Sequence, residues 1–332
     1  MAGGQERVLR RRIRSVQSTK KITKAMELIA ASQIVRSLNR MTANRAYRLG
    51  MARLVVEAAK GDPTAAAKLL GTPDERQNVA VLSVVADRGL SGPYNTATLR
   101  ATERLLAELS SGGVGVRLFT VGKKAQSYFR FRGQDVERSF VGVSERPSFS
   151  DAREIAAAVA APFVAGDVDQ VLLVSTRYLS AGSQVAQVRQ LLPLPDPTAT
   201  GGNESRGGAG TAGAGQGPHA SEEPAIGGDR SGAPAGSGGG GGGYTEFEPD
   251  VDTLLAALGP KAVESEIFTA LLEGAASFFT AQQRAMAAAS ENADELIRTL
   301  SRIMNRARQD AITTEIMEIV GGAEALRQSK GA

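Results

Sequence analysis

The residue types that carry most enzymatic chemistry are scarce in this sequence. It contains no cysteine, which excludes disulfides, thiolate metal sites and cysteine nucleophiles. Its single histidine, His219, lies in a tract of Gly, Ala, Pro and Ser, where a solvated linker residue is expected. Histidine-based metal sites and Ser-His-Asp triads are therefore not expected in this chain.

Two stretches have the position, but not the pattern, of a phosphate-binding site. Residues 86–95, ADRGLSGPYN, follow a predicted strand and precede a predicted helix, yet they fit neither GxGxxG nor GxxxxGK[ST]. Lys123 and Lys124 also follow a predicted strand, but two lysines carry little specificity. Carboxylate pairs such as Glu264 and Glu266 lie on what reads as a solvated helix face. The sequence thus predicts a structural turn at 86–95 and no catalytic, cofactor-binding or metal site.

The positive charge is concentrated at the N-terminal end. The net charge is only +4, but the acids up to Lys60 are just Glu6, Glu27 and Glu57, among many arginines and lysines. This pattern is typical of a nucleic-acid arm, a transit peptide or a helix that faces an acidic partner. Nucleic-acid binding is disfavoured because no known binding module is present and Tyr47 is the only aromatic residue there. No apolar run approaches the ~18–20 residues that a membrane-spanning helix needs.

Both ends of the chain read as very long helices. Residues 5–60 hold no proline and one glycine, Gly50, and would span roughly 80 Å as a helix. After Gly259-Pro260 a similar stretch would span roughly 90 Å. Such helices need a partner along their length, and apolar steps of four and three predict an antiparallel coiled coil. The expected seam consists of Leu9, Ile13, Val16, Ile22, Met26 and Ile29 in the first helix and Leu296, Leu300, Ile303, Ala307, Ile312, Ile316 and Ile319 in the second.

The middle of the chain alternates between predicted strands and helices, which is typical of a small α/β domain with a mostly parallel sheet. Between its last strand and a short helix, residues 196–243 consist mainly of Gly, Ala, Pro and Ser. This segment is predicted to be a disordered surface insertion. Strands are expected at 79–86, 114–122, 170–178 and 183–194, and helices at 96–109, 151–161 (capped by Ser150) and 251–258.

The predicted fold class is therefore α/β: a small Rossmann-like α/β domain with a long antiparallel coiled coil formed by the N- and C-terminal helices. We divide the chain into an N-terminal helix at 1–60, an α/β foot domain at 74–258 that contains the insertion, and a C-terminal helix at 259–332.

Three separated motifs resemble the γ subunit family of F-type ATP synthases. RRRIRSVQSTKKITKAMELIAASQ at 10–33 is similar to the family's N-terminal signature, and NRARQDAITTEIMEIVGGAEAL at 305–326 to its C-terminal one. DRGLSGPYN at 87–95 is similar to the loop after its first strand. The composition and the absence of a targeting peptide favour a bacterial, high-GC member.

The resemblance implies a non-catalytic rotor, present once per complex. In this family the coiled coil enters a ring of α and β subunits, and the foot binds the ε subunit and the membrane-embedded c-ring. Rotation driven by proton flow changes the conformations of the β subunits in turn and so drives ATP synthesis. The expected location is the cytoplasmic side of the cell membrane, as a peripheral protein, without cofactors and without nucleic acid.

The resemblance also assigns partner contacts by position. Lys24, Met26 and Glu27 are expected to face the mobile domains of β. Arg308, Gln309 and Thr313 are expected to meet a β loop nearer the tip, and Ile316 and Ile319 to run in an apolar bearing of the ring. The alternative for these isoleucines is the core of the coiled coil. For the whole chain, the alternatives are a dinucleotide-binding enzyme and a free coiled-coil scaffold.

Overall fold

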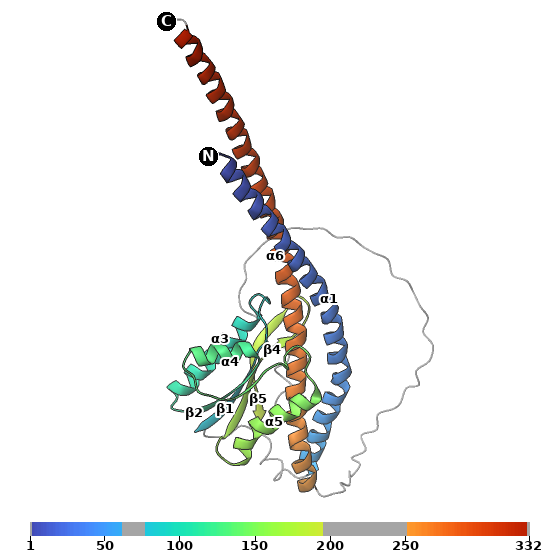
Figure 1. The fold of residues 1–332 in the computed structure, drawn as a ribbon. Helices are drawn as coiled ribbons and strands as arrows, with labels where there is room; N and C mark the ends of the chain where they lie inside the picture. Colours follow the sequence, from blue (N-terminus) through green and yellow to red (C-terminus); the bar gives the residue numbers. More distant parts are fainter. Residues whose placement is uncertain (1, 62–76, 195–250, 331–332) are drawn as a thin grey trace, which may run out of the picture.

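Two long antiparallel helices form a shaft, and a small α/β domain is attached to one side of its lower part (Figure 1). The computed structural model describes residues 2–61, 77–194 and 251–330. Helix α1 (Ala2–Gly61) has 60 residues and helix α6 (Val251–Lys330) has 80, and the two lie in extensive contact. The predicted architecture is confirmed. The predicted insertion at 196–243 lies outside the described residues.

The foot, residues 77–194, is built on a five-stranded sheet with the order β3-β2-β1-β4-β5. Neighbouring strands run parallel except at the β4–β5 hairpin, which is antiparallel, so the sheet is mostly parallel as predicted. The strands are β1 (Asn78–Val84), β2 (Gly115–Val121), β3 (Val136–Phe140), β4 (Gln170–Tyr178) and β5 (Gln184–Leu192). The helices are α3 (Tyr94–Ser111), α4 (Lys123–Phe131) and α5 (Phe149–Val164).

Both faces of the sheet are covered, which explains the continuous apolar run of β1. Leu82 and Val84 pack in a cluster with α5 and with shaft residues such as Ile267. Val79 and Val81 pack on the other face against α3 and α4. The shaft is therefore part of the hydrophobic core of the foot.

Two predicted helix starts were wrong. Helix α6 begins at Val251 and includes Pro260, although Gly259-Pro260 was expected to separate two helices. The proline itself is exposed, while Leu258 and Ala262 are buried against the core, so tertiary packing outweighs the local cost of the proline. Helix α5 is capped by Ser148 and not by Ser150.

The cap of α5 is a reciprocal pair of hydrogen bonds. The Ser148 hydroxyl accepts from the backbone N–H of Asp151 at 3.1 Å, and the Asp151 carboxylate accepts from the backbone N–H of Ser148 at 2.7 Å. This capping box satisfies two backbone donors at once, which a cap at Ser150 would not do.

Candidate functional site

Polar side chains hold the two shaft helices in register. Lys20 Nζ lies 2.6 Å from Asp294 Oδ1, and the hydroxyls of Thr23 and Ser290 lie 2.7 Å apart. Further down, Asn44 donates to the hydroxyl of Thr269 at 2.9 Å. The Thr23–Ser290 pair is buried, and a buried polar pair fixes the alignment of paired helices because any shift leaves a polar group without a partner. These pairs join residues far apart in the sequence and were not predicted.

The seam of the shaft differs in part from the predicted one. Ile13 and Leu300 are buried as expected, but Ile22 and Ile29 are each 60% exposed. The buried positions are their neighbours Thr23 and Ala30. The seam of α1 is thus occupied by small and polar side chains at these positions. The prediction followed large apolar residues and therefore placed the seam one residue too early there.

The predicted contact residues on α1 lie around the middle of the shaft. Lys24 and Glu27 form an ion pair with Nζ–Oε1 at 2.9 Å, and the Lys24 side chain is more than half exposed. Met26 is half-buried and lines a cavity of about 250 Å³ with Phe278 and Gln282 of α6. An ion pair three residues apart on a helix surface contributes little to stability, and the Lys24 ammonium is exposed enough to meet a partner.

The predicted contact residues on α6 lie at the far end of the shaft. Arg308, Gln309 and Thr313 are exposed. Ile316 and Ile319 are 54% and 66% exposed, so the alternative that placed them in the coiled-coil core is wrong. The eight residues therefore form two separate groups, since Arg308 lies about 20 Å beyond Asp294 at 1.5 Å rise per residue.

The end of α6 has no partner helix among the described residues. Gln5, near the start of α1, lines a small cavity with Ala307 and Thr314 of α6. Beyond that level α6 continues alone, as the red end of the ribbon shows in Figure 1. Among the described side chains, the large apolar ones exposed on this segment are Ile316, Met317, Ile319 and Val320, and the half-exposed Ile312 lies just before it.

The loop after β1 is a structural turn organised by Asp87. Its carboxylate accepts hydrogen bonds from the backbone N–H of Lys123 at 3.0 Å and of Gly142 at 2.9 Å. Ser144 adds its backbone N–H at 3.2 Å and its hydroxyl at 2.6 Å. Burial alone would raise the pKa of Asp87, but these hydrogen bonds outweigh it and hold the pKa below the ordinary value. The turn joins the carboxyl ends of β1, β2 and β3.

We expect Asp87→Asn to destabilise the chain by about 1–2 kcal/mol at pH 7, because charge-assisted hydrogen bonds to the carboxylate are lost. Since the pKa of Asp87 is lower in the folded state, its contribution is present above the unfolded pKa. It is lost as the pH falls through the folded pKa. Urea unfolding from pH 7 to pH 3 should show the two proteins converging at acid pH.

Asp167→Asn is the matched control, since Asp167 forms only a half-exposed ion pair with Arg117 at 3.1 Å. It should change the free energy of unfolding by less than about 1 kcal/mol. Equal losses in both variants, or a loss at Asp87 that does not depend on pH, would contradict the assigned role.

The described residues offer no metal-binding cluster of three or more His, Cys, Asp or Glu side chains. Among the helices in the described ranges, none is long and apolar enough to cross a membrane. What the structure presents instead is a shaft of two paired helices, with the predicted contact residues around its middle and at the far end of α6.

Comparison with known proteins shows the family to which this chain belongs. The protein-family model described as ATP synthase matches residues 5–326. An ATP synthase gamma chain from Parafrankia sp. is 42% identical over 327 residues, which are 97% of this chain and 98% of that protein. The chain belongs to the ATP synthase gamma chain family. A gamma chain from Streptomyces coelicolor is 37% identical over 98% of this chain and 97% of its own length. Both relatives are actinobacterial, in agreement with the predicted high-GC origin.

Solved structures share the fold. A chain in the Euglena gracilis mitochondrial ATP synthase structure aligns with a TM-score of 0.63 at 17% identity, over 99% of this chain and 97% of that one. A chain in the Tetrahymena thermophila structure of the central stalk and c-ring aligns with a TM-score of 0.56 at 21% identity, over 81% of this chain and 99% of that one. As a gamma chain, the protein is the central-stalk rotor subunit of F-type ATP synthase and a non-catalytic subunit of that complex.

Proposed function

We propose that the two exposed groups on the shaft are its contacts with the catalytic ring of α and β subunits. The observation that carries this proposal is the lone end of α6. Four large apolar side chains are more than half exposed there, on a helix without a partner in the described residues. A single helix of about 20 residues is marginally stable in water, and clustered exposed apolar side chains indicate a protein contact. An apolar sleeve in the ring would cover Ile316 and Ile319.

The group on α1 has a different chemistry. Lys24 and Glu27 carry opposite charges, while the neighbouring Ile22, Leu28 and Ile29 are largely exposed apolar side chains. Because these side chains all belong to α1, the α1 side of the shaft carries a different surface from the α6 side at the same height. A rotating shaft of this kind presents a different surface to each surrounding β subunit. Because contacts that favour one conformation shift its population, rotation would move each β subunit through its states in turn.

The remaining contacts of the proposed complex belong to the foot. The similar Tetrahymena chain belongs to a structure of the central stalk and c-ring, and the similar Euglena chain to a structure of OSCP, F1 and the c-ring. By this likeness the foot binds the c-ring and the ε subunit, and one copy of the chain occupies the axis of the complex. The location that follows is peripheral, on the cytoplasmic side of the cell membrane.

Affinity purification from membranes tests this proposal. A tagged full-length chain expressed in its source bacterium should recover α, β, ε and c subunits, with α and β in threefold excess over the chain. The purified chain alone should show no ATP hydrolysis and no saturable ATP binding. Recovery without α and β, or a stoichiometric ATP complex of micromolar affinity, would contradict the proposed role.

A further inference from the structure

The edge strand β5 points a charged side chain at the shaft. Arg189 of β5 places Nη1 3.5 Å from Glu266 Oε2 and Nη2 3.8 Å from Glu273 Oε2, both on α6. The other oxygen of Glu266 lies 3.9 Å from Nη1 of Arg48 on α1. One cluster of charges thus joins the foot to both helices of the shaft.

The Glu273 end of this cluster is removed from water, whereas Arg48 and Glu266 are about one third exposed. Glu273 is 8% exposed, and burial raises the pKa of its carboxyl group against the opposing effect of Arg189 and two further arginines. Oε2 of Glu273 and Nε of Arg189 have no hydrogen-bond partner among the described residues. Desolvated charges in such loose geometry add little to folding stability, but they strongly favour one alignment of the elements that carry them.

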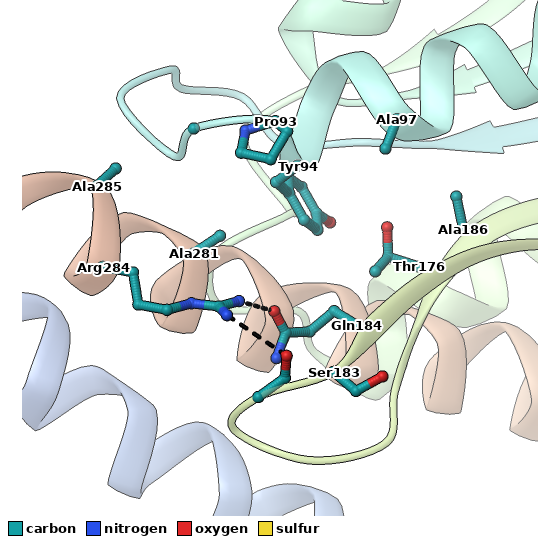
Figure 2. Close-up of a pocket in the computed structure, with 12 residues that line it drawn as sticks. Pro93, Tyr94, Ala97, Thr176, Ser183, Gln184, Ala186, Ala281, Arg284 and Ala285 are labelled. Atoms are coloured by element: carbon teal, nitrogen blue, oxygen red, sulfur yellow. Dashed lines mark hydrogen bonds between the residues drawn. The ribbon is translucent and has the colours of Figure 1, made fainter. Parts of the chain in front are cut away.

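A second polar contact lies at the start of the same strand. The guanidinium of Arg284 on α6 donates to Oε1 of Gln184 and, at 3.5 Å, to the backbone oxygen of Gly182 (Figure 2). The Gln184 amide in turn donates to the backbone oxygen of Ser180 at 2.6 Å. The shaft is thereby tied to the turn between β4 and β5.

At this height foot and shaft are joined by packing as well as by polar contacts, since Tyr94 of α3 lies in a hydrophobic cluster with Phe278 and Phe279 of α6. Beside this cluster lies a cavity of about 560 Å³, which is lined by Tyr94 and Thr176 of the foot and by Ala281 and Ala285 of α6. Figure 2 shows the Arg284–Gln184 contact at the rim of this cavity. The packing at this height is interrupted by the cavity, and the polar contacts add directional constraints on the alignment of foot and shaft.

We propose that Arg189 and Arg284, through Glu273 and Gln184, form a two-point clamp on β5 that transmits torque between foot and shaft. The inference rests on the proposed function, in which the c-ring turns the foot. Torque pushes the foot sideways around the shaft. Apolar burial is non-directional, whereas each arginine loses its partners when β5 shifts along or around α6. Arg189 and Arg284 are positioning residues of the rotor.

The test compares proton pumping with hydrolysis in the complete ATP synthase that contains this chain, reconstituted in vesicles. In Arg189→Met and in Arg284→Met, protons pumped per ATP hydrolysed should fall about threefold, as expected for loss of one ion-pair or charged hydrogen-bond contact. Hydrolysis by the catalytic sector detached from the membrane should stay unchanged, because no torque passes through the foot there. Arg189→Lys keeps the charge and should restore pumping.

The matched control is Arg138→Met, because the Arg138–Glu154 pair at 2.7 Å lies wholly within the foot. It should leave pumping and hydrolysis unchanged. A pumping ratio at the parental value in both clamp variants would overturn the clamp, as would an equal fall in detached hydrolysis. If the parental chain itself failed to support pumping, the proposed function would fail instead, and the two failures are thus distinguishable.

Discussion

Replacing Gly122 by alanine is expected to destabilise the chain by about 3 kcal/mol or more, the sum of a left-handed backbone penalty and an overpacking cost. Gly122 ends β2 at φ +93°, and a Cβ atom there would lie 2.3 Å from the backbone oxygen of Val85. That oxygen belongs to the main chain after β1, so it cannot move without shifting the turn that Asp87 organises. Urea unfolding followed by circular dichroism measures the loss.

Gly133→Ala separates the two causes. Gly133 has φ +71°, but nothing lies within 4 Å of an added Cβ atom. Its replacement should cost only the backbone strain, about 1 kcal/mol. Similar losses in the two variants would show that the close approach of β1 to Gly122 does not constrain the foot.

The fold was predictable where local pattern and tertiary packing agree. The apolar run of β1 predicts a strand covered on both faces, and the structure has one. Strand β3 was missed because only the first and last of its five residues, VERSF, are apolar, so they show no clear alternation. Its backbone pairing with β2 stabilises it, which no short-range pattern shows. Pro260 illustrates the opposite error, since a strong local signal is overridden by packing around it.

The candidate contact residues come from motif resemblance and stay a prediction, and their geometry could not be read from the sequence. Motif resemblance selected Arg308 and Ile316, yet their exposure depends on where α1 begins relative to α6. That register is fixed by Lys20 with Asp294 and Thr23 with Ser290, pairs more than 260 positions apart in the sequence. The clamp on β5 was missed for the same reason, since Arg189 carries no local signal that points to α6.

The double substitution of Arg308 and Gln309 by alanine is expected to lower the turnover of the assembled complex by about ten- to a hundredfold, since charged hydrogen bonds are each worth about 1.5–3 kcal/mol. Both side chains are exposed beside the half-buried Ala307, so their removal leaves the shaft packing intact and assembly should persist. Arg308→Lys keeps the charge but not the planar donor fork, and should retain part of the activity. Arg104→Ala removes an exposed arginine from α3 of the foot and should have no effect on turnover. The measurement is steady-state ATP hydrolysis per assembled complex, with the subunit ratio checked for each variant. Loss of assembly with normal turnover in the complexes that remain would mean that Arg308 and Gln309 support packing and do not act on the β subunits.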